Sequence, residues 1–162
     1  MNLNYKLQFI KPKETVLELF CDPSYYAHHQ AALGSIDYEQ LEHQDDGTHF
    51  HIKCRYRVKS EAPLPGFAKK VLGETSEVTH EERWDRATGH GKLTIHVAGM
   101  PGTMTCDLAL ADGPKGCTKT FDWEVKVKIP LVGGKIEGLI AEDIKRKSAP
   151  DEAAVNKLLA DS

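Results

Sequence analysis

The end of the chain constrains the fold more than any other part of it. A long segment alternates apolar with polar residues, and its apolar positions are Phe121, Trp123, Val125, Val127 and Ile129. This alternation is typical of a strand with one buried face. Residues 130–134 (Pro-Leu-Val-Gly-Gly) then break the strand, and an amphipathic segment follows to the last residue. A long strand, a break and a terminal helix together predict a curved antiparallel sheet that wraps around the helix.

The terminal segment has an apolar stripe at helical spacing, formed by Ile136, Leu139, Ile140 and Ile144. Pro150 is expected to interrupt this helix, because proline lacks the N–H that a helix interior needs. Ser148 then serves as the cap of a continuation, with Asp151 in a capping-box-like position. The continuation carries a second apolar stripe, formed by Val155, Leu158 and Leu159.

The rest of the chain predicts one strand, two short helices and a meander of strands. The first strand covers Leu3 to Phe9, and helices follow over about 14–21 and 24–33, separated by an Asp22-Pro23 capping signal. Six further strands are expected over about 35–44, 49–59, 76–85, 91–98, 103–111 and 117–129. Residues 61–73 predict an excursion from the sheet. The predicted fold class is α+β, with a seven-stranded antiparallel sheet around the long terminal helix, in a single domain over residues 1–162.

The composition limits the classes of partner and the cellular compartment that we expect for this chain. A formal net charge of −3 over 162 residues gives no reason to expect nucleic acid as a partner. No run of about 18 apolar residues predicts integral membrane association, and the first residues lack the pattern of a signal peptide. Four scattered cysteines without CxxC spacing predict free thiols in a reducing cytoplasm. We therefore expect a cytoplasmic protein, whose protein partners the sequence does not identify.

Two local motifs and the order of elements resemble a known superfamily. Residues 20–23 (Phe-Cys-Asp-Pro) are similar to its helix–Asp-Pro–helix passage, and residues 128–134 (Lys-Ile-Pro-Leu-Val-Gly-Gly) to its strand end before the terminal helix. This is the START-like, polyketide-cyclase-like SRPBCC superfamily, which has the helix-grip fold, and the chain most resembles a bacterial subfamily of unknown function. The resemblance implies an apolar cavity between sheet and helix. Members bind lipids, sterols, isoprenoids or aromatic polyketides, and some catalyse cyclisation or hydrolysis.

The residues predicted to face the cavity share an inward position on a strand or on the terminal helix. The ligand-binding candidates are Tyr5, Phe9, Phe50, Ile52, Tyr56, Val78, His80, Trp84, Ile95, Met104, Leu108, Trp123, Ile136, Ile140 and Ile144. Leu7, Leu93, Val97, Cys106 and Val125 are further inward candidates, and many residues of this set would be core in any fold.

His80 and Glu82 are the candidate catalytic residues, because they share one strand face with Val78 and Trp84. On an inward face, burial and mutual attraction would tune a His–carboxylate pair for general acid–base work. The preferred interpretation is simpler. A bulge in a curved strand moves one or both side chains into solvent, as the charged run Glu81-Glu82-Arg83 suggests.

Other histidines and the cysteines predict little chemistry. Only one of His28 and His29 can face the cavity mouth, since adjacent helical residues diverge by about 100°. His49 and His51 share a strand face with several cations, so a solvated outer face is expected there rather than a metal site. Cys54 and Cys106, both inward, are expected to be small buried hydrophobes. We expect neither a metal nor another cofactor.

Three functions remain open from the sequence. The first is a carrier or sensor of a small hydrophobic ligand, with Tyr5, Tyr56 or His80 supplying an orienting hydrogen bond. The second is a cyclase, dehydratase or hydrolase that uses His80 and Glu82 as acid and base. The third is a protein-interaction module with a filled cavity.

Overall fold

The computed structural model describes residues 1–59, 66, 69–70 and 74–161. Most of the predicted excursion over 61–73 lies outside the described residues. The elements follow in the order β1 (Asn2–Phe9), α1 (Lys13–Phe20), α2 (Pro23–Ala32), β2 (Ile36–Asp45), β3 (His49–Lys59), β4 (Thr75–Asp85), β5 (His90–Val97), β6 (Gly102–Gly113), β7 (Gly116–Val127) and α4 (Gly133–Ala160).

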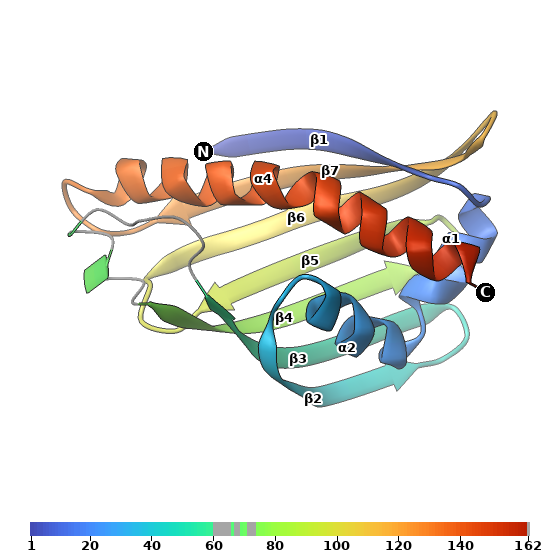
Figure 1. Cartoon of the computed structure of the whole chain (residues 1–162), viewed down its shortest axis with the longest axis horizontal. Helices are drawn as coiled ribbons and strands as arrows, with labels where there is room; N and C mark the ends of the chain where they lie inside the picture. Colours follow the sequence, from blue (N-terminus) through green and yellow to red (C-terminus); the bar gives the residue numbers. More distant parts are fainter. Residues whose placement is uncertain (60–65, 67–68, 71–73, 162) are drawn as a thin grey trace.

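Within the described residues, seven strands form one antiparallel sheet in the order β1-β7-β6-β5-β4-β3-β2. Strands β2 to β7 are a simple meander, and β1 joins it by pairing with the last strand. The sheet curves around α4, which lies along β1 and β7, while α2 lies nearer the opposite edge (Figure 1). The predicted helix-grip architecture is confirmed.

The predicted inward face of β7 is confirmed by burial. Phe121, Trp123, Val125 and Val127 are all buried, whereas the residues between them are exposed. Ile129 lies beyond the end of the strand and packs half-buried against the core. The alternation therefore specified both the strand and the face that meets the helix layer.

Helices α1 and α2 meet at a capped turn. Asp22 has extended backbone angles and its carboxylate accepts a hydrogen bond from the N–H of Ser24 at 3.0 Å, and Pro23 occupies the first turn of α2. A cap of this kind satisfies one of the free N–H groups at a helix start. Gly34, with φ +87°, follows the end of α2 and turns the chain toward β2. These contacts place one face of α2 over the sheet.

Helix α4 is attached to the sheet at both ends. Gly133 begins the helix so close to β7 that a Cβ atom there would lie 2.4 Å from the carbonyl oxygen of Val127. Near the other end, the carboxylate of Glu152 accepts from the N–H of Gln8 at 2.8 Å, and the side chain of Asn156 accepts from the N–H of Ile10 at 3.0 Å. These side chains satisfy backbone groups on the free edge of β1 and cover that edge.

The predicted interruption of this helix is wrong, because α4 continues from residue 133 to residue 160 with Pro150 inside it. Ser148 does not cap a second helix either. Its hydroxyl donates to the carbonyl oxygen of Lys145 at 2.7 Å, within the same helix. Proline removes only one helix hydrogen bond directly. Contacts of the C-terminal half with β1 and with α2 hold that half in place, and no sequence pattern reports them.

Candidate functional site

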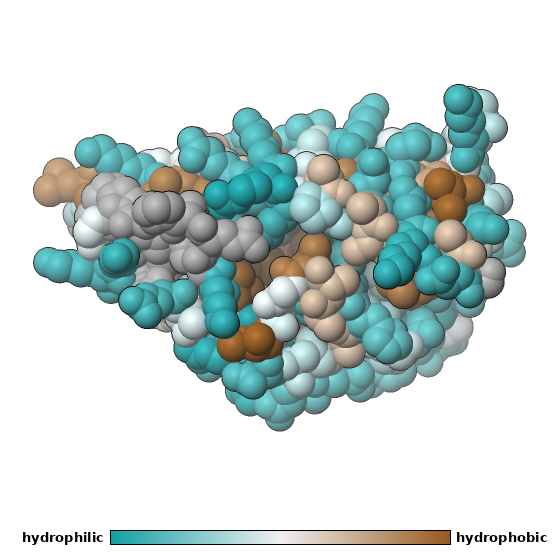
Figure 2. All heavy atoms as spheres, viewed as in Figure 1, coloured by the Kyte–Doolittle hydropathy of each residue, from teal (hydrophilic) through white to brown (hydrophobic). Residues whose placement is uncertain are grey.

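A cavity of about 340 Å³ lies between the inner face of the sheet, α2 and α4. Figure 2 shows a hollow with hydrophobic side chains at the corresponding place on the surface between the two helices. Its apolar wall comes mainly from β4 to β7 and from α4. Nine of the predicted ligand-facing residues line it: Tyr5, Tyr56, Val78, His80, Ile95, Met104, Trp123, Ile140 and Ile144.

The other predicted ligand-facing residues do not line this cavity. Phe9, Phe50, Ile52, Trp84, Leu108 and Ile136 are all buried in the core. Their inward parity was correct, but other core side chains fill the space next to them. Phe9 and Trp84, for example, pack against the ring of Phe20 from α1. Position along a strand therefore decides whether an inward residue meets the cavity or the core.

His80 and Glu82 both point inward, so the interpretation that placed them in solvent is wrong. β4 pairs with β3 and β5 without a register shift, so no bulge turns these side chains outward. His80 is 6% exposed and Glu82 is 4% exposed. Nε2 of His80 lies 2.9 Å from Oε1 of Glu82, and Nδ1 lies 3.1 Å from the hydroxyl of Tyr56. Because an ionised carboxylate only accepts, Nε2 carries a proton; whenever the ring is neutral, Nδ1 then accepts from Tyr56.

The second oxygen of Glu82 is also fully engaged. Oε2 accepts from the indole N–H of Trp84 at 2.6 Å and lies 3.0 Å from the hydroxyl of Tyr26. That hydroxyl is also 2.6 Å from the carbonyl oxygen of Phe20, so it shares one proton between two acceptors. We call Tyr26, Tyr56, His80, Glu82 and Trp84 the inner polar network.

These contacts set the protonation state of the carboxyl group. Burial alone would raise the pKa of Glu82, since it disfavours the charged form. The hydrogen bond from His80, the positive charge of Lys119 and the indole N–H of Trp84 outweigh burial and lower the pKa to about 2. The carboxylate is therefore ionised at neutral pH. Burial raises the pKa of the Tyr26 and Tyr56 phenols well above the usual value, so both stay protonated donors.

Lys119 is the main polar residue that the sequence-based candidates missed. It lies on β7, is 7% exposed and lines the cavity. Its Nζ atom is 4.3 Å from the ring centroid of Phe20, 4.5 Å from that of Phe121 and 5.4 Å from that of Trp84. A signal for it was present: Lys119 precedes Phe121 by two residues and so has the parity of the buried face.

The cavity mouth lies between α2 and α4. His29 lines it and its Nε2 lies 2.6 Å from Oδ1 of Asp151, which joins the two helices. His28 is exposed, as the prediction for this pair required. The sequence candidates also omitted the α2 wall and the charged rim of α4, which are Tyr25, Tyr26, His29, Gln30, Leu33, Glu142, Asp143, Arg146, Lys147 and Asp151.

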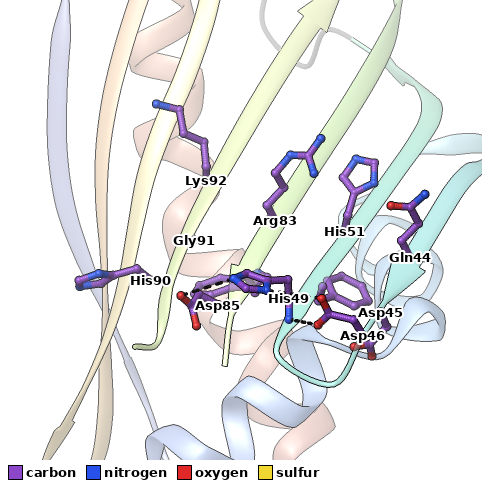
Figure 3. Close-up of a pocket in the computed structure, with 12 residues that line it drawn as sticks. Gln44, Asp45, Asp46, His49, His51, Arg83, Asp85, His90, Gly91 and Lys92 are labelled. Carbon is purple, nitrogen blue, oxygen red and sulfur yellow. Dashed lines mark hydrogen bonds and ion pairs between the residues drawn. The ribbon is translucent and has the colours of Figure 1, made fainter. Parts of the chain in front are cut away.

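A second hollow of about 720 Å³ lies on the opposite face of the sheet (Figure 3). His51, Arg83 and Lys92 rise from neighbouring strands on this outer face. Arg83 forms an ion pair with Glu81 at 3.0 Å, and Lys92 forms one with Asp107 at 3.2 Å. Arg83 and Lys92, the lysine and arginine side chains that line this hollow, are thus already paired and largely solvated. The lining residues are Gln44, Asp45, Asp46, His49, Phe50, His51, Arg83, Trp84, Asp85, His90, Gly91 and Lys92.

The prediction of two solvated histidines on this face is correct for His49 and wrong for His51. His49 is exposed, and Figure 3 shows it beside Asp46 and Asp85. His51 is buried, because its strand neighbours Gln44 and Arg83 flank it. Among the described residues, no three His, Cys, Asp or Glu side chains are arranged to hold a metal ion. Cys54 and Cys106 are buried free thiols, and burial raises the pKa of each to about 12.

No helix in the part of the chain that the structure describes has both the length and the hydropathy to span a membrane.

Comparison with known proteins shows the family to which the chain belongs. Residues 4–159 match a family model described as a protein of unknown function (DUF2505). No curated protein sequence matches the chain. Among solved structures, TTHA0849 from Thermus thermophilus is similar over all of both chains, with a TM-score of 0.72 and 13% identity.

Two further solved structures are similar along almost the whole chain. The Zhui aromatase/cyclase from a Streptomyces species has a TM-score of 0.66 and 15% identity, over 97% of this chain and 92% of that one. A START superfamily protein from Mycobacterium smegmatis has a TM-score of 0.65 and 15% identity, over 97% and 98%. The predicted resemblance to the fold of the START-like, polyketide-cyclase-like superfamily is confirmed. At these identities the likeness shows the fold alone.

Proposed function

We propose that this chain, which belongs to the DUF2505 family, binds a small and largely apolar ligand in the inner cavity, as a carrier or sensor. The observation that carries the proposal is a cavity of about 340 Å³ with aliphatic and aromatic walls and a few convergent polar groups. Sites for small molecules are typically concave and mostly apolar, with volumes from roughly 300 Å³ upward. Lipids, isoprenoids and aromatic polyketide-like molecules have the matching chemistry.

The geometry favours binding over acid–base catalysis by His80 and Glu82. Both nitrogens of the imidazole are engaged, one by Tyr56 and one by the carboxylate. Both oxygens of the carboxylate are engaged as well. A general base must lie within hydrogen-bond reach of the proton it removes, and here both groups are already hydrogen-bonded to each other and to their neighbours. The network instead fixes the inner end of the cavity in one arrangement.

Native mass spectrometry of the purified protein tests the proposal, with a cavity-filling variant as the comparison. Ile95 lies on the cavity wall of β5, and Ile95→Trp fills part of the space. Thr94→Trp is the matched control, since Thr94 is the exposed neighbour on the outer face of the same strand. We expect a small molecule of defined mass with the wild-type protein and the control, and its loss with Ile95→Trp.

A fluorescent probe with a large aromatic body and one sulfonate group provides a second test when no ligand survives purification. 1-Anilinonaphthalene-8-sulfonate should bind the wild-type protein and Thr94→Trp alike, and Ile95→Trp at least about tenfold more weakly, because the cavity walls supply most of the buried apolar area. Equal binding by all three folded proteins would contradict the proposal.

A further inference from the structure

Lys119 is a cation held in an aromatic cage at the inner end of the cavity. Strand β7 sets its side chain inward, in register with Leu7 on β1 and Leu110 on β6. Its ammonium group lies over the rings of Phe20 and Phe121, between 4.3 and 4.5 Å from their centroids. The faces of aromatic rings attract a cation, and more strongly where water is excluded. The rings thus hold the ammonium group in place without using its N–H bonds.

Nothing among the described residues accepts those N–H bonds. No carboxylate forms an ion pair with Lys119, and its ammonium group has no hydrogen-bond acceptor in the part of the chain that the structure describes. Glu82 attracts it only through space, and both oxygens of Glu82 already accept from His80 and Trp84. A buried cation without a hydrogen-bonded partner is unfavourable. A hydrogen bond from this ammonium group to an acceptor on a ligand should therefore stabilise the complex more than the same bond from a cation in water would.

We propose that Lys119 forms a subsite for the carboxylate of an otherwise apolar ligand, which enters with its acidic end toward β7. This inference rests on the proposed function, because the rest of the ligand occupies the apolar part of the cavity. Three features distinguish this subsite from the charged rim of the cavity. Lys119 is 7% exposed, its ammonium group has no ion-pair partner among the described residues, and apolar side chains such as Phe121, Met104 and Trp123 line the same cavity.

Two probes of similar size separate the contribution of an acidic group to binding from that of the apolar ring system. 2-Naphthoate carries a carboxylate at neutral pH, whereas 2-naphthalenemethanol carries a neutral hydroxyl group on the same ring system. Isothermal titration with each probe gives a ratio of dissociation constants for the wild-type protein. We expect 2-naphthoate to bind about tenfold more tightly or better, since a hydrogen bond to a charged group contributes more than a neutral one.

Lys119→Met removes the charge and keeps much of the length of the side chain. Lys126→Met is the matched control, because Lys126 lies on the outer, exposed side of the same strand and pairs with Glu124. We expect Lys119→Met to bind the alcohol as the wild-type protein does and to lose the preference for the carboxylate. Lys126→Met should keep that preference.

The outcomes separate this inference from the function on which it rests. Equal affinity of the wild-type protein for the two probes would overturn the subsite and leave apolar binding in place. Binding of neither probe by the folded wild-type protein would overturn both proposals. A carboxylate preference that survives in Lys119→Met would assign it to another cation. If Lys119→Met does not fold, the wild-type ratio and the same ratio in Lys119→Gln decide the question.

Discussion

Two hollows on opposite faces of one sheet differ in whether their lysine and arginine side chains are paired with carboxylates. The outer hollow is about 720 Å³ and the inner cavity about 340 Å³. In the outer hollow, Arg83 and Lys92 are exposed and paired with carboxylates. In the inner cavity, Lys119 is buried, in contact with apolar walls and without an acceptor from the described residues. A ligand in the larger hollow should gain little binding free energy over water, because contacts with exposed ion pairs contribute little.

If the inner cavity is the binding site, as we propose, then the smaller hollow is the functional one, and an unpaired charge in a buried, largely apolar place is a better guide to a site than volume. The inner face also contains the polar groups that are costly to disturb. The outer face contains charges that salt and water screen. Substitutions on the two faces should therefore differ sharply, and the following predictions use matched pairs on neighbouring residues.

The largest effect is expected for Glu82→Ala. It leaves His80, Trp84 and Lys119 buried without their anionic partner, which should reduce the free energy of unfolding by roughly 3–5 kcal/mol. The control is Glu81→Ala, one residue away on the outer face, which should cost less than about 1 kcal/mol. Urea denaturation measures both. Similar losses for the two variants would show that the two faces do not differ as described.

A second pair separates core from cavity on α4. Ile136 is fully buried, and Ile136→Ala should reduce the free energy of unfolding by about 3 kcal/mol, as for other large-to-small core changes. Ile140 is half-buried and lines the cavity, so Ile140→Ala should cost less and mainly weaken binding of the fluorescent probe. Chemical denaturation and probe fluorescence measure the two effects. A larger stability loss for Ile140→Ala would reverse the assignment.

The ionisation of Glu82 predicts how stability depends on acid. Its pKa in the folded protein, about 2, lies below its ordinary value of 4.5. Between these values the unfolded chain binds more protons, so stability from this group is full above about pH 4.5 and is lost as the pH falls toward 2. The groups that face the carboxylate are His80, Lys119, Trp84 and Tyr26. Melting temperatures from pH 6 to pH 3 should fall more steeply for the wild-type protein than for Glu82→Gln, and equal slopes would contradict this.

The smallest effect is expected on the outer face. Arg83→Ala removes an exposed ion pair with Glu81 and should change the free energy of unfolding by no more than about 0.5 kcal/mol. Probe binding in the inner cavity should not change. Thermal denaturation checks this, and a loss above about 1 kcal/mol would show that the outer hollow has a structural role that its geometry does not indicate.

The fold was largely predictable from the sequence because alternation and turn signals are local. The strand from Phe121 to Val127 and the Asp22 cap both form as their patterns indicate. The continuity of α4 through Pro150 was not predictable, because contacts with residues far away in the chain stabilise its last turns. A single-residue breaker is a local signal, and here tertiary packing overrides it.

The site was predictable only in part. The alternation along a strand predicts which face of the sheet a side chain lies on, but it does not predict the hydrogen-bond partners of that side chain. His80 and Glu82 had inward parity, but the exposed appearance of their charged neighbours favoured solvent. Their burial depends on the hydroxyl of Tyr26 from α2 and on the indole N–H of Trp84, which both donate hydrogen bonds to the carboxylate of Glu82. Lys119 was missed because a lysine on an apolar strand face suggests the edge of the buried region rather than its centre.

A crystal structure of the protein with 2-naphthoate tests the central claim most directly. We predict that the naphthalene ring lies inside the cavity between α2 and α4, against Ile95 and Ile140, with its carboxylate at the ammonium group of Lys119. The outer hollow should remain free of it. A probe bound at Arg83 and Lys92 on the outer face, or an inner cavity closed by its own side chains in the presence of saturating probe, would contradict the account.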